Sequence, residues 1–85
     1  MSAYIFSSPT CPPCTALKPV FEELKEEFST LQWKHVNIKN DPDGLTQQYG
    51  VKVVPTLVTV SSAGVIQSHS GTNIAGYYRI LRQTS

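Results

Sequence analysis

The chain contains two cysteines, Cys11 and Cys14, which are separated by two prolines. The segment Ala3–Phe6 before them is short, apolar and β-prone, and the segment after them has helical periodicity. The pair is therefore predicted at the join between a strand and a helix. We interpret the rest of the sequence as a scaffold that positions these two sulfurs.

A helix is predicted to begin near Cys11. Pro12 and Pro13 suit its first turn, where backbone N–H groups have no helical partner. Pro19 falls inside the helix and should kink it, because proline removes one hydrogen bond and crowds the preceding turn. The apolar residues that follow at helical spacing form one stripe: Leu17, Val20, Phe21, Leu24 and Phe28.

The middle of the chain predicts a strand and a short helix. Apolar and polar side chains alternate along Leu31–Ile38, which is typical of a strand. Asp41 and Pro42 then predict a helix start, with an N-cap acceptor followed by proline at the first helical position. Gly50 is expected to end this helix.

The last third of the chain predicts a hairpin and a helix. Thr56–Val60 and Val65–His69 are expected to pair as antiparallel strands across a glycine-containing turn. A helix should then run from about Thr72 or Asn73 to Leu81. The order β-α-β-α-β-β-α predicts an α/β fold with a four-stranded mixed sheet flanked by three helices, which cover both faces. The inward residues of the last helix are expected to be Ile74, Tyr77 or Tyr78, and Leu81.

Length and charge narrow the class of protein. The 85 residues (1–85) predict a single domain, because a chain of this size forms one core. The net charge of +1 does not favour nucleic acid, and no apolar run approaches the roughly 20 residues of a membrane span. The start at Met1, without a secretory signal, leads us to expect a cytoplasmic protein. We also expect a monomer, because no long apolar face is left over.

The cysteine pair suits thiol–disulfide exchange. This reaction needs a thiolate, whereas a free cysteine with a pKa of about 8.5 is mostly protonated at neutral pH. At a helix N-terminus, Cys11 would lie beside unpaired N–H groups and the positive end of the helix dipole, both of which favour the anion. We predict that Cys11 is the exposed nucleophile and that the more covered Cys14 is the resolving thiol. No cofactor is required.

Other roles for a cysteine pair are less well supported. A zinc site is not expected, because the chain has no second CxxC, and His35 and His69 lack ligand spacing. A purely structural disulfide across two residues would close too small a loop to stabilise much. A metal or cluster shared between two chains is a further alternative. Since lone intracellular pairs are more often catalytic or metal-binding than structural, disulfide exchange is favoured.

With these features together, the sequence resembles the thioredoxin superfamily over nearly its whole length. The resemblance rests on the strand–loop–CxxC–helix unit with Pro19 five residues after Cys14, on the segment Tyr49–Thr56, and on Ser70 and Gly71 before the last helix. It implies the compact thioredoxin fold and a protein disulfide reductase.

The same resemblance implies a second wall of the site. The Val54–Pro55 bond would be cis and would lie against the cysteine pair. In the family, the backbone before this proline pairs with the substrate chain like an added strand. The residues implied to bind the substrate are Thr10, Pro12, Pro13, Val54, Pro55 and Gly71.

The sequence departs from the family at the resolving cysteine. Ile5 occupies the position of a buried acid that is proposed to take the proton of that thiol, and His35 falls near the position of its lysine partner. Two family tryptophans correspond to Ser7 and Thr10. The group that deprotonates Cys14 is therefore the main open question. His35 is one hypothesis, and a solvated surface histidine is the alternative.

The resemblance also suggests partners. A disulfide-containing protein, such as ribonucleotide reductase, would be the substrate, and a reductase or glutathione would donate electrons. A glutaredoxin is the nearest alternative function, although Val53-Val54-Pro55 and the single Ser70-Gly71 pair are closer to thioredoxins. A non-catalytic interaction module and a metal or cluster carrier are further alternatives.

We predict that iodoacetamide below saturation alkylates Cys11 of the reduced, folded protein faster than Cys14. The reason is the lower pKa and better exposure expected at the helix start. Peptide mapping by mass spectrometry measures the ratio, and in urea the two thiols should react alike. Faster alkylation of Cys14 in the folded protein would reverse the assigned roles.

Overall fold

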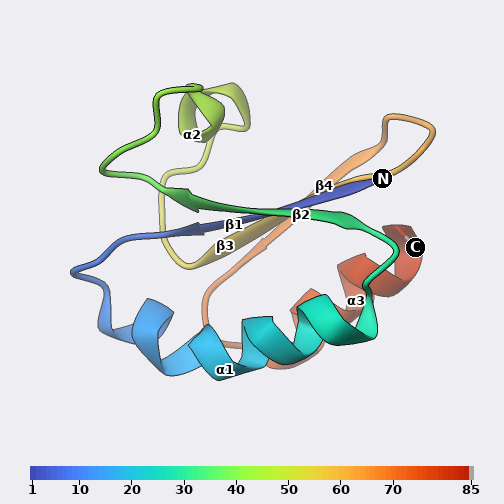
Figure 1. The fold of residues 1–85 in the computed structure, drawn as a ribbon, viewed down its shortest axis with the longest axis horizontal. Helices are drawn as coiled ribbons and strands as arrows, with labels where there is room; N and C mark the ends of the chain where they lie inside the picture. The colour runs from blue at the N-terminus through green and yellow to red at the C-terminus, as the bar shows by residue number, and fades with distance from the viewer. Residues whose placement is uncertain (85) are drawn as a thin grey trace.

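The structure, a computed structural model, describes residues 1–84 (Figure 1). Its elements follow the predicted order β-α-β-α-β-β-α. They are β1 (Ser2–Ser7), α1 (Pro12–Glu27), β2 (Gln32–Asn37), α2 (Leu45–Gln48), β3 (Thr56–Val60), β4 (Ile66–Ser70) and α3 (Ile74–Thr84).

The four strands form one mixed sheet in the order β2-β1-β3-β4. β1 pairs with β2 in parallel and with β3 in antiparallel orientation, and β3 pairs with β4 as the predicted antiparallel hairpin. The parallel pair needs a crossover connection, which α1 supplies. The predicted four-stranded mixed sheet with three helices is confirmed.

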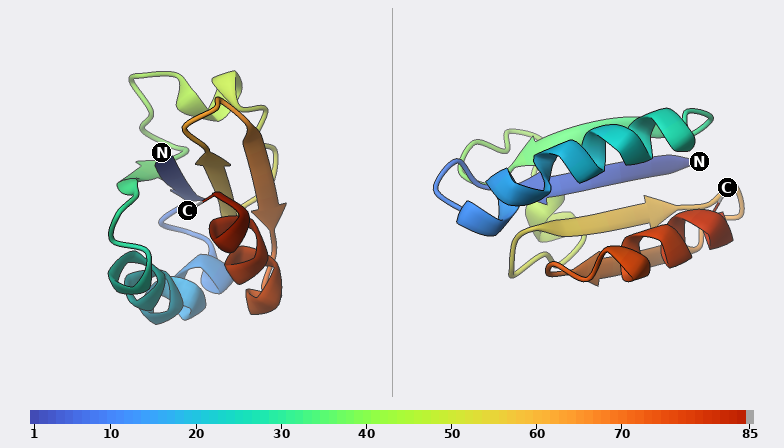
Figure 2. Two further views of the ribbon diagram at one scale, coloured as in Figure 1. Left: turned by 90° about the vertical axis from the view of Figure 1, so that its right-hand side faces the viewer. Right: turned by 90° about the horizontal axis from the view of Figure 1, so that it is seen from below.

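Helices cover both faces of the sheet, as predicted. α1 and α3 lie on one face, and the short α2 lies on the opposite face (Figures 1 and 2). Each face has its own cluster of buried apolar side chains. The larger cluster, under α1 and α3, includes Ile5, Phe21, Leu24 and Tyr77. The smaller one, under α2, contains Phe6, Val36 and Val58.

β1 is central because it contributes to both clusters. Successive strand side chains point to opposite faces. Ala3 and Ile5 therefore pack under α1 and α3, whereas Phe6 packs under α2. All three are fully buried, which explains why this segment is apolar without alternation. Its carboxyl end leads directly into the cysteine loop.

α1 begins as the sequence predicts. Cys11 is its N-cap residue, and Pro12 and Pro13 occupy its first two positions. Pro19 lies inside the helix. Of the predicted apolar stripe, four members are buried and Val20 is partly buried. The four are Leu17, Phe21, Leu24 and Phe28.

The prediction that a helix starts at Asp41 and Pro42 is wrong. α2 begins at Leu45, with Gly44 at its N-cap in the left-handed conformation (φ +68°). The Asp41 carboxylate still accepts a hydrogen bond, at 2.7 Å, from the N–H of Thr46. Asp41 thus caps the segment from further upstream, because a turn separates it from the helix.

α3 also differs from the prediction at its first residue. Tyr77, Ile80 and Leu81 are buried, as a helix face against the sheet requires. Ile74, which was predicted to face inward, is 39% exposed. It is the first residue of α3, where less of the protein covers that face.

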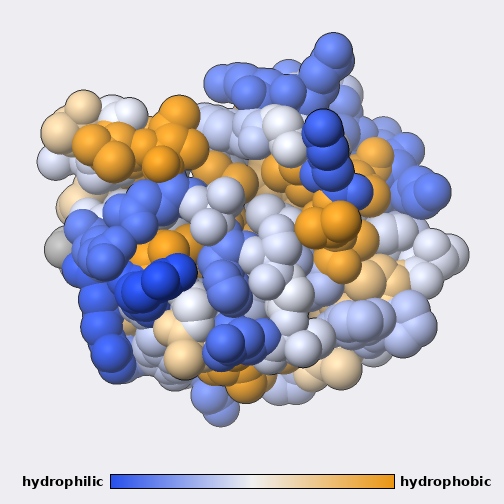
Figure 3. All heavy atoms as spheres, turned by 180° about the vertical axis from the view of Figure 1, so that it is seen from behind, coloured by the Kyte–Doolittle hydropathy of each residue, from blue (hydrophilic) through white to orange (hydrophobic). Residues whose placement is uncertain are grey.

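The surface carries scattered apolar groups. Figure 3 shows orange apolar atoms divided by polar ones on the face seen from behind. The exposed large apolar side chains include Val53, Val65, Ile66 and Ile74. Within residues 1–84, none of the helices is long and apolar enough to cross a membrane.

α3 approaches β4 closely at Gly76. A Cβ atom at this position would overlap the imidazole ring of His69. That ring is held by an edge-on contact with Tyr77, with 4.7 Å between ring centroids, and its Nε2 lies 3.0 Å from the carbonyl oxygen of Asn73. Glycine inside a helix lowers stability by roughly 1 kcal/mol relative to alanine. At position 76 this loss is accepted because only glycine leaves room for the His69 ring.

We predict that Gly76→Ala lowers the free energy of unfolding by about 1–3 kcal/mol, because the added methyl overpacks the His69 ring. Urea denaturation measures this change. In a His69→Ala background the same substitution should instead raise stability by up to about 1 kcal/mol, since helix propensity then dominates. An equal effect in the two backgrounds would contradict the proposed overlap.

Candidate active site

The cysteine pair lies where the chain passes from the β1–α1 loop into α1. Cys11 and Cys14 are joined as a disulfide, with 5.2 Å between their Cα atoms. The Cys11 sulfur accepts a hydrogen bond from the backbone N–H of Cys14 at 3.2 Å. A sulfur at this place also lies at the positive end of the helix dipole. Both effects favour the thiolate of Cys11 once the disulfide is reduced.

The two sulfurs differ in exposure. Cys11 is half-buried, whereas Cys14 is only 7% exposed. The difference follows from the helix geometry, since the N-cap residue lies at the margin and the next turn faces the sheet. An incoming disulfide therefore meets Cys11 more readily than Cys14.

The second wall of the site is the backbone before Pro55. The Val54–Pro55 peptide bond is cis. The carbonyl oxygen of Val54 lies 3.8 Å from the Cys11 sulfur, although the two residues are 43 positions apart. The Pro55 side chain is fully buried, so the wall presents the backbone of Val54 rather than the proline ring.

A hydrogen-bond network links this wall to α3. The N–H of Gly71 donates to the carbonyl of Pro55 at 3.1 Å. The hydroxyl of Tyr77 donates to the carbonyl of Gly71 and lies 3.4 Å from that of Pro55. Thr56 also donates, at 2.6 Å, to the carbonyl of Val53. The network connects two of the predicted site residues, Pro55 and Gly71.

Tyr77 is a site-supporting residue that sequence reasoning missed. The helical spacing of apolar residues in this segment indicated only that Tyr77 or Tyr78 faces inward. The side chain is fully buried, and this burial raises the pKa of its phenol to about 12. The hydroxyl therefore stays protonated and remains a hydrogen-bond donor throughout the neutral range.

The other predicted substrate-binding residues lie on the loop and the first helical turn. Thr10, Pro12 and Pro13 are all exposed beside Cys11 in the chain. The hydroxyl of Thr10 is 3.2 Å from that of Ser8. Val53, which the sequence did not single out, is 58% exposed next to the Val54 wall. The margin of the site therefore offers uncharged and partly apolar groups.

The far side of the disulfide has different chemistry. Ile5 is fully buried, so the position of the family's acid is filled by an apolar side chain. His35 lies on the strand next to it and is paired with it in register. The imidazole Nε2 of His35 is 2.5 Å from the hydroxyl of Ser7. Burial, together with the positive charges of Lys25 and Lys18, lowers the pKa of His35 below its usual value.

Among residues 1–84, no three or more His, Cys, Asp or Glu side chains gather in a way that could hold a metal ion. Besides Cys14, the titratable side chains that line the space on this side of the disulfide are two lysines, a glutamate and His35.

Solved structures show which class of fold this is. The X-ray structure of Fasciola hepatica thioredoxin superposes with a TM-score of 0.86 at 20% identity, covering 98% of this chain and 79% of that one. Schistosoma mansoni thioredoxin gives a TM-score of 0.87 at 19% identity, covering 99% and 76%. The protein thus has the thioredoxin fold, with a CxxC pair at a helix start opposite a cis-proline.

The sequence comparisons identify the family. The thioredoxin family model matches residues 4–79. Thioredoxin-3 of Dictyostelium discoideum is 34% identical over 82% of this chain and 66% of its own length. A thioredoxin of Methanocaldococcus jannaschii is 36% identical over 64% of each chain. The chain belongs to the thioredoxin family, and it spans about two-thirds of the length of these relatives.

We predict that Tyr77→Phe lowers the free energy of unfolding by about 1 kcal/mol near neutral pH, since it removes the donor to Gly71. The folded phenol has a pKa of about 12, above the roughly 10 of an unfolded tyrosine. The unfolded chain thus loses its proton first, and stability should fall as the pH rises from about 10 to about 12.

Urea denaturation at several alkaline pH values measures this loss. Tyr77→Phe should make the alkaline loss of stability shallower. An unchanged slope in Tyr77→Phe would show that this phenol does not carry the effect.

Proposed function

We propose that this protein is a thiol–disulfide oxidoreductase that reduces disulfides of other proteins. The observation that carries the proposal is the place of Cys11, half-exposed at the N-cap of α1 with its sulfur facing the Val54 carbonyl. Membership of the thioredoxin family supports it further. The relatives matched are named thioredoxins, which makes a glutaredoxin the less favoured function.

The reaction has two exchange steps. In the reduced protein, the Cys11 thiolate attacks one sulfur of the partner's disulfide, and the other sulfur leaves as a thiolate with the bonding electron pair. Cys14 then loses its proton and attacks the Cys11 sulfur of the mixed disulfide. The partner leaves with two thiols, and Cys11 and Cys14 are left oxidised, as in the structure.

The surface around Cys11 suits recognition by backbone and shape. We propose that the partner segment lies along the backbone of Val54, which would pair with it as with an added strand. Gly71 would line the same groove, because its N–H is bonded to the Pro55 carbonyl. The remaining substrate-binding residues in this proposal are Thr10, Pro12, Pro13 and the Pro55 backbone.

Each reaction cycle passes two electrons from a donor to a substrate disulfide, so the protein needs two kinds of partner. We propose a disulfide-containing protein such as ribonucleotide reductase as the substrate, and a reductase or glutathione as the electron donor. The dithiol itself carries the electrons, so no further cofactor is needed. A monomer in a reducing compartment such as the cytoplasm would keep the pair ready to react.

We predict that the reduced protein accelerates the precipitation of insulin by dithiothreitol. Cys11→Ser should abolish this acceleration, because no nucleophile remains at the helix start. Cys14→Ser, reduced beforehand and mixed with insulin in the absence of dithiothreitol, should form a mixed disulfide that persists, because the resolving thiol is missing. Turbidity and non-reducing electrophoresis measure the two outcomes.

Two controls sharpen this test. The double serine variant shows whether serine at these positions disturbs folding, as circular dichroism reports. Replacing dithiothreitol with a thioredoxin reductase or with glutathione distinguishes the electron donors. Acceleration of insulin precipitation by Cys11→Ser at the wild-type rate would overturn the proposed function.

A further inference from the structure

A cleft of about 380 Å³ opens on the side of the disulfide away from the Val54 wall. Cys14 lines it, and the opposite walls come from α1 and from the strands β1 and β2. The face of β1 under α1 carries Ala3, Ile5 and Ser7, and these residues pair in register with Trp33, His35 and Asn37 of β2. The last pair on this face, Ser7 and Asn37, has small, polar side chains. These side chains do not fill the space beneath the first turns of α1, and the cleft remains there.

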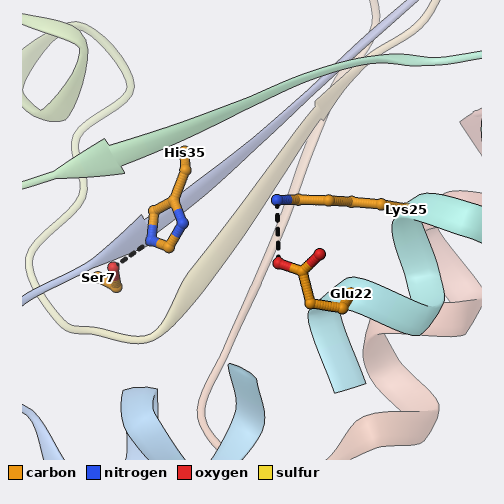
Figure 4. A network of polar contacts seen from close by, with 4 residues as sticks. All are labelled: Ser7, Glu22, Lys25 and His35. Carbon is orange, nitrogen blue, oxygen red and sulfur yellow. Dashed lines mark hydrogen bonds and ion pairs between the residues drawn. The ribbon is translucent and has the colours of Figure 1, made fainter. Parts of the chain in front are cut away.

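The cleft contains a hydroxyl–imidazole pair. Ser7 is the last residue of β1, at the end nearest the cysteine loop. Its Oγ lies 2.5 Å from Nε2 of His35 (Figure 4). Both residues line the same cleft as Cys14. When the proton of the neutral imidazole is on Nδ1, Nε2 accepts a hydrogen bond from the Ser7 hydroxyl.

Burial and two lysines lower the pKa of His35 and keep it neutral, against the smaller opposing effect of Glu22. Lys18, Glu22 and Lys25 line the cleft from α1. Glu22 pairs with Lys25 at 3.4 Å, and Lys25 extends from α1 toward His35 (Figure 4). Burial first, and then the charges of Lys25 and Lys18, lower the pKa of His35. At neutral pH the imidazole is therefore an available base.

His35 is the best matched of these groups for taking a proton from a thiol. Lys18 and Lys25 are cations and have no free lone pair. The Glu22 carboxylate is paired with Lys25 and is a weaker base than imidazole. Proton transfer is most efficient when the pKa of the base lies near the working pH, which favours a histidine.

We propose that Ser7 and His35 form a proton relay for Cys14. The relay accepts the proton of the Cys14 thiol, which the apolar side chain of Ile5 cannot do. The inference rests on the proposed disulfide exchange. His35 acts through the Ser7 hydroxyl and water in the cleft, so it is a positioning and relay residue for the resolving step. The cleft volume is enough for several waters, each of which occupies about 30 Å³ in the liquid.

The step balances as follows. The Cys14 proton passes through cleft water to the Ser7 oxygen while the Ser7 proton passes to Nε2 of His35, which becomes an imidazolium. The Cys14 thiolate attacks the Cys11 sulfur, and a new Cys11–Cys14 bond forms. The bond between Cys11 and the partner sulfur breaks, and the partner leaves as a thiolate with the electron pair. The imidazolium then returns its proton to water or to that thiolate.

Stopped-flow reaction of the reduced protein with 5,5′-dithiobis(2-nitrobenzoate) separates the two exchange steps. Attack by Cys11 releases one coloured thiolate, and resolution by Cys14 releases the second. The coloured thiolate leaves without needing a proton, so the second phase isolates the deprotonation of Cys14. The matched control is His69→Gln, which changes the other histidine.

At pH 7, His35→Gln should slow the second phase about tenfold. This is less than the roughly 10²–10⁴ that general base catalysis contributes, because His35 acts through a hydroxyl and water. The first phase should stay within about twofold of wild type. Ser7→Ala should slow the second phase in the same direction, and His69→Gln should leave both phases unchanged.

The pH profile distinguishes a relay from a structural role. In the wild type the second phase should be flat from the His35 pKa up to the thiol pKa. It should fall only in acid, below the pKa of His35, which burial and the neighbouring lysines hold under that of an ordinary histidine. In His35→Gln the rate should rise with unit slope and reach the wild-type rate above about pH 9, where Cys14 is already a thiolate.

Two results would overturn the relay. One is a His35→Gln second phase with the wild-type rate and plateau. The other is a deficit that persists above about pH 9, because it would reflect altered packing rather than a missing base. Loss of the first phase in the wild type itself would instead refute the proposed oxidoreductase, so the two failures are distinguishable.

Discussion

The hydrogen bond from the Cys14 N–H to the Cys11 sulfur is the contact on which the site depends. It exists because α1 begins at this residue, and α1 begins there because two prolines follow the N-cap. The same helix start buries Cys14 and leaves Cys11 partly open. The rest of the fold positions this contact. Because α1 connects the parallel strands β1 and β2, the cysteine loop lies at the carboxyl end of β1.

The local sequence predicted this half of the site well. The apolar stripe, the prolines and the CxxC spacing act over a few residues, so periodicity and capping rules apply directly. The second wall depended on the family resemblance, because no local rule places Val54 against Cys11 across 43 positions. The start of α2 was misplaced for a related reason. Asp41 does accept a hydrogen bond from the N–H of Thr46, but an intervening turn makes Gly44 the N-cap residue of α2.

Contacts that arise only from tertiary packing could not be predicted from the pattern. Tyr77 was expected to face inward, yet nothing in the sequence indicates that its hydroxyl binds the Gly71 carbonyl. His35 was one hypothesis for a substitute base, with a solvated surface histidine as the alternative, and only the register of β1 and β2 brings it to the hydroxyl of Ser7. The two sides of the disulfide thereby differ in chemistry. One presents a backbone carbonyl and uncharged residues, and the other presents a cleft that ionisable groups share with apolar side chains.

The contact between His69 and Gly76 has a consequence for how such a sequence can change over generations. The ring occupies the volume that any side chain at position 76 would need. A larger residue at position 76 therefore meets the ring unless position 69 has first become smaller, whereas a smaller residue at position 69 meets no such overlap. The order in which these two positions change thus decides whether the junction of β4 and α3 is strained on the way.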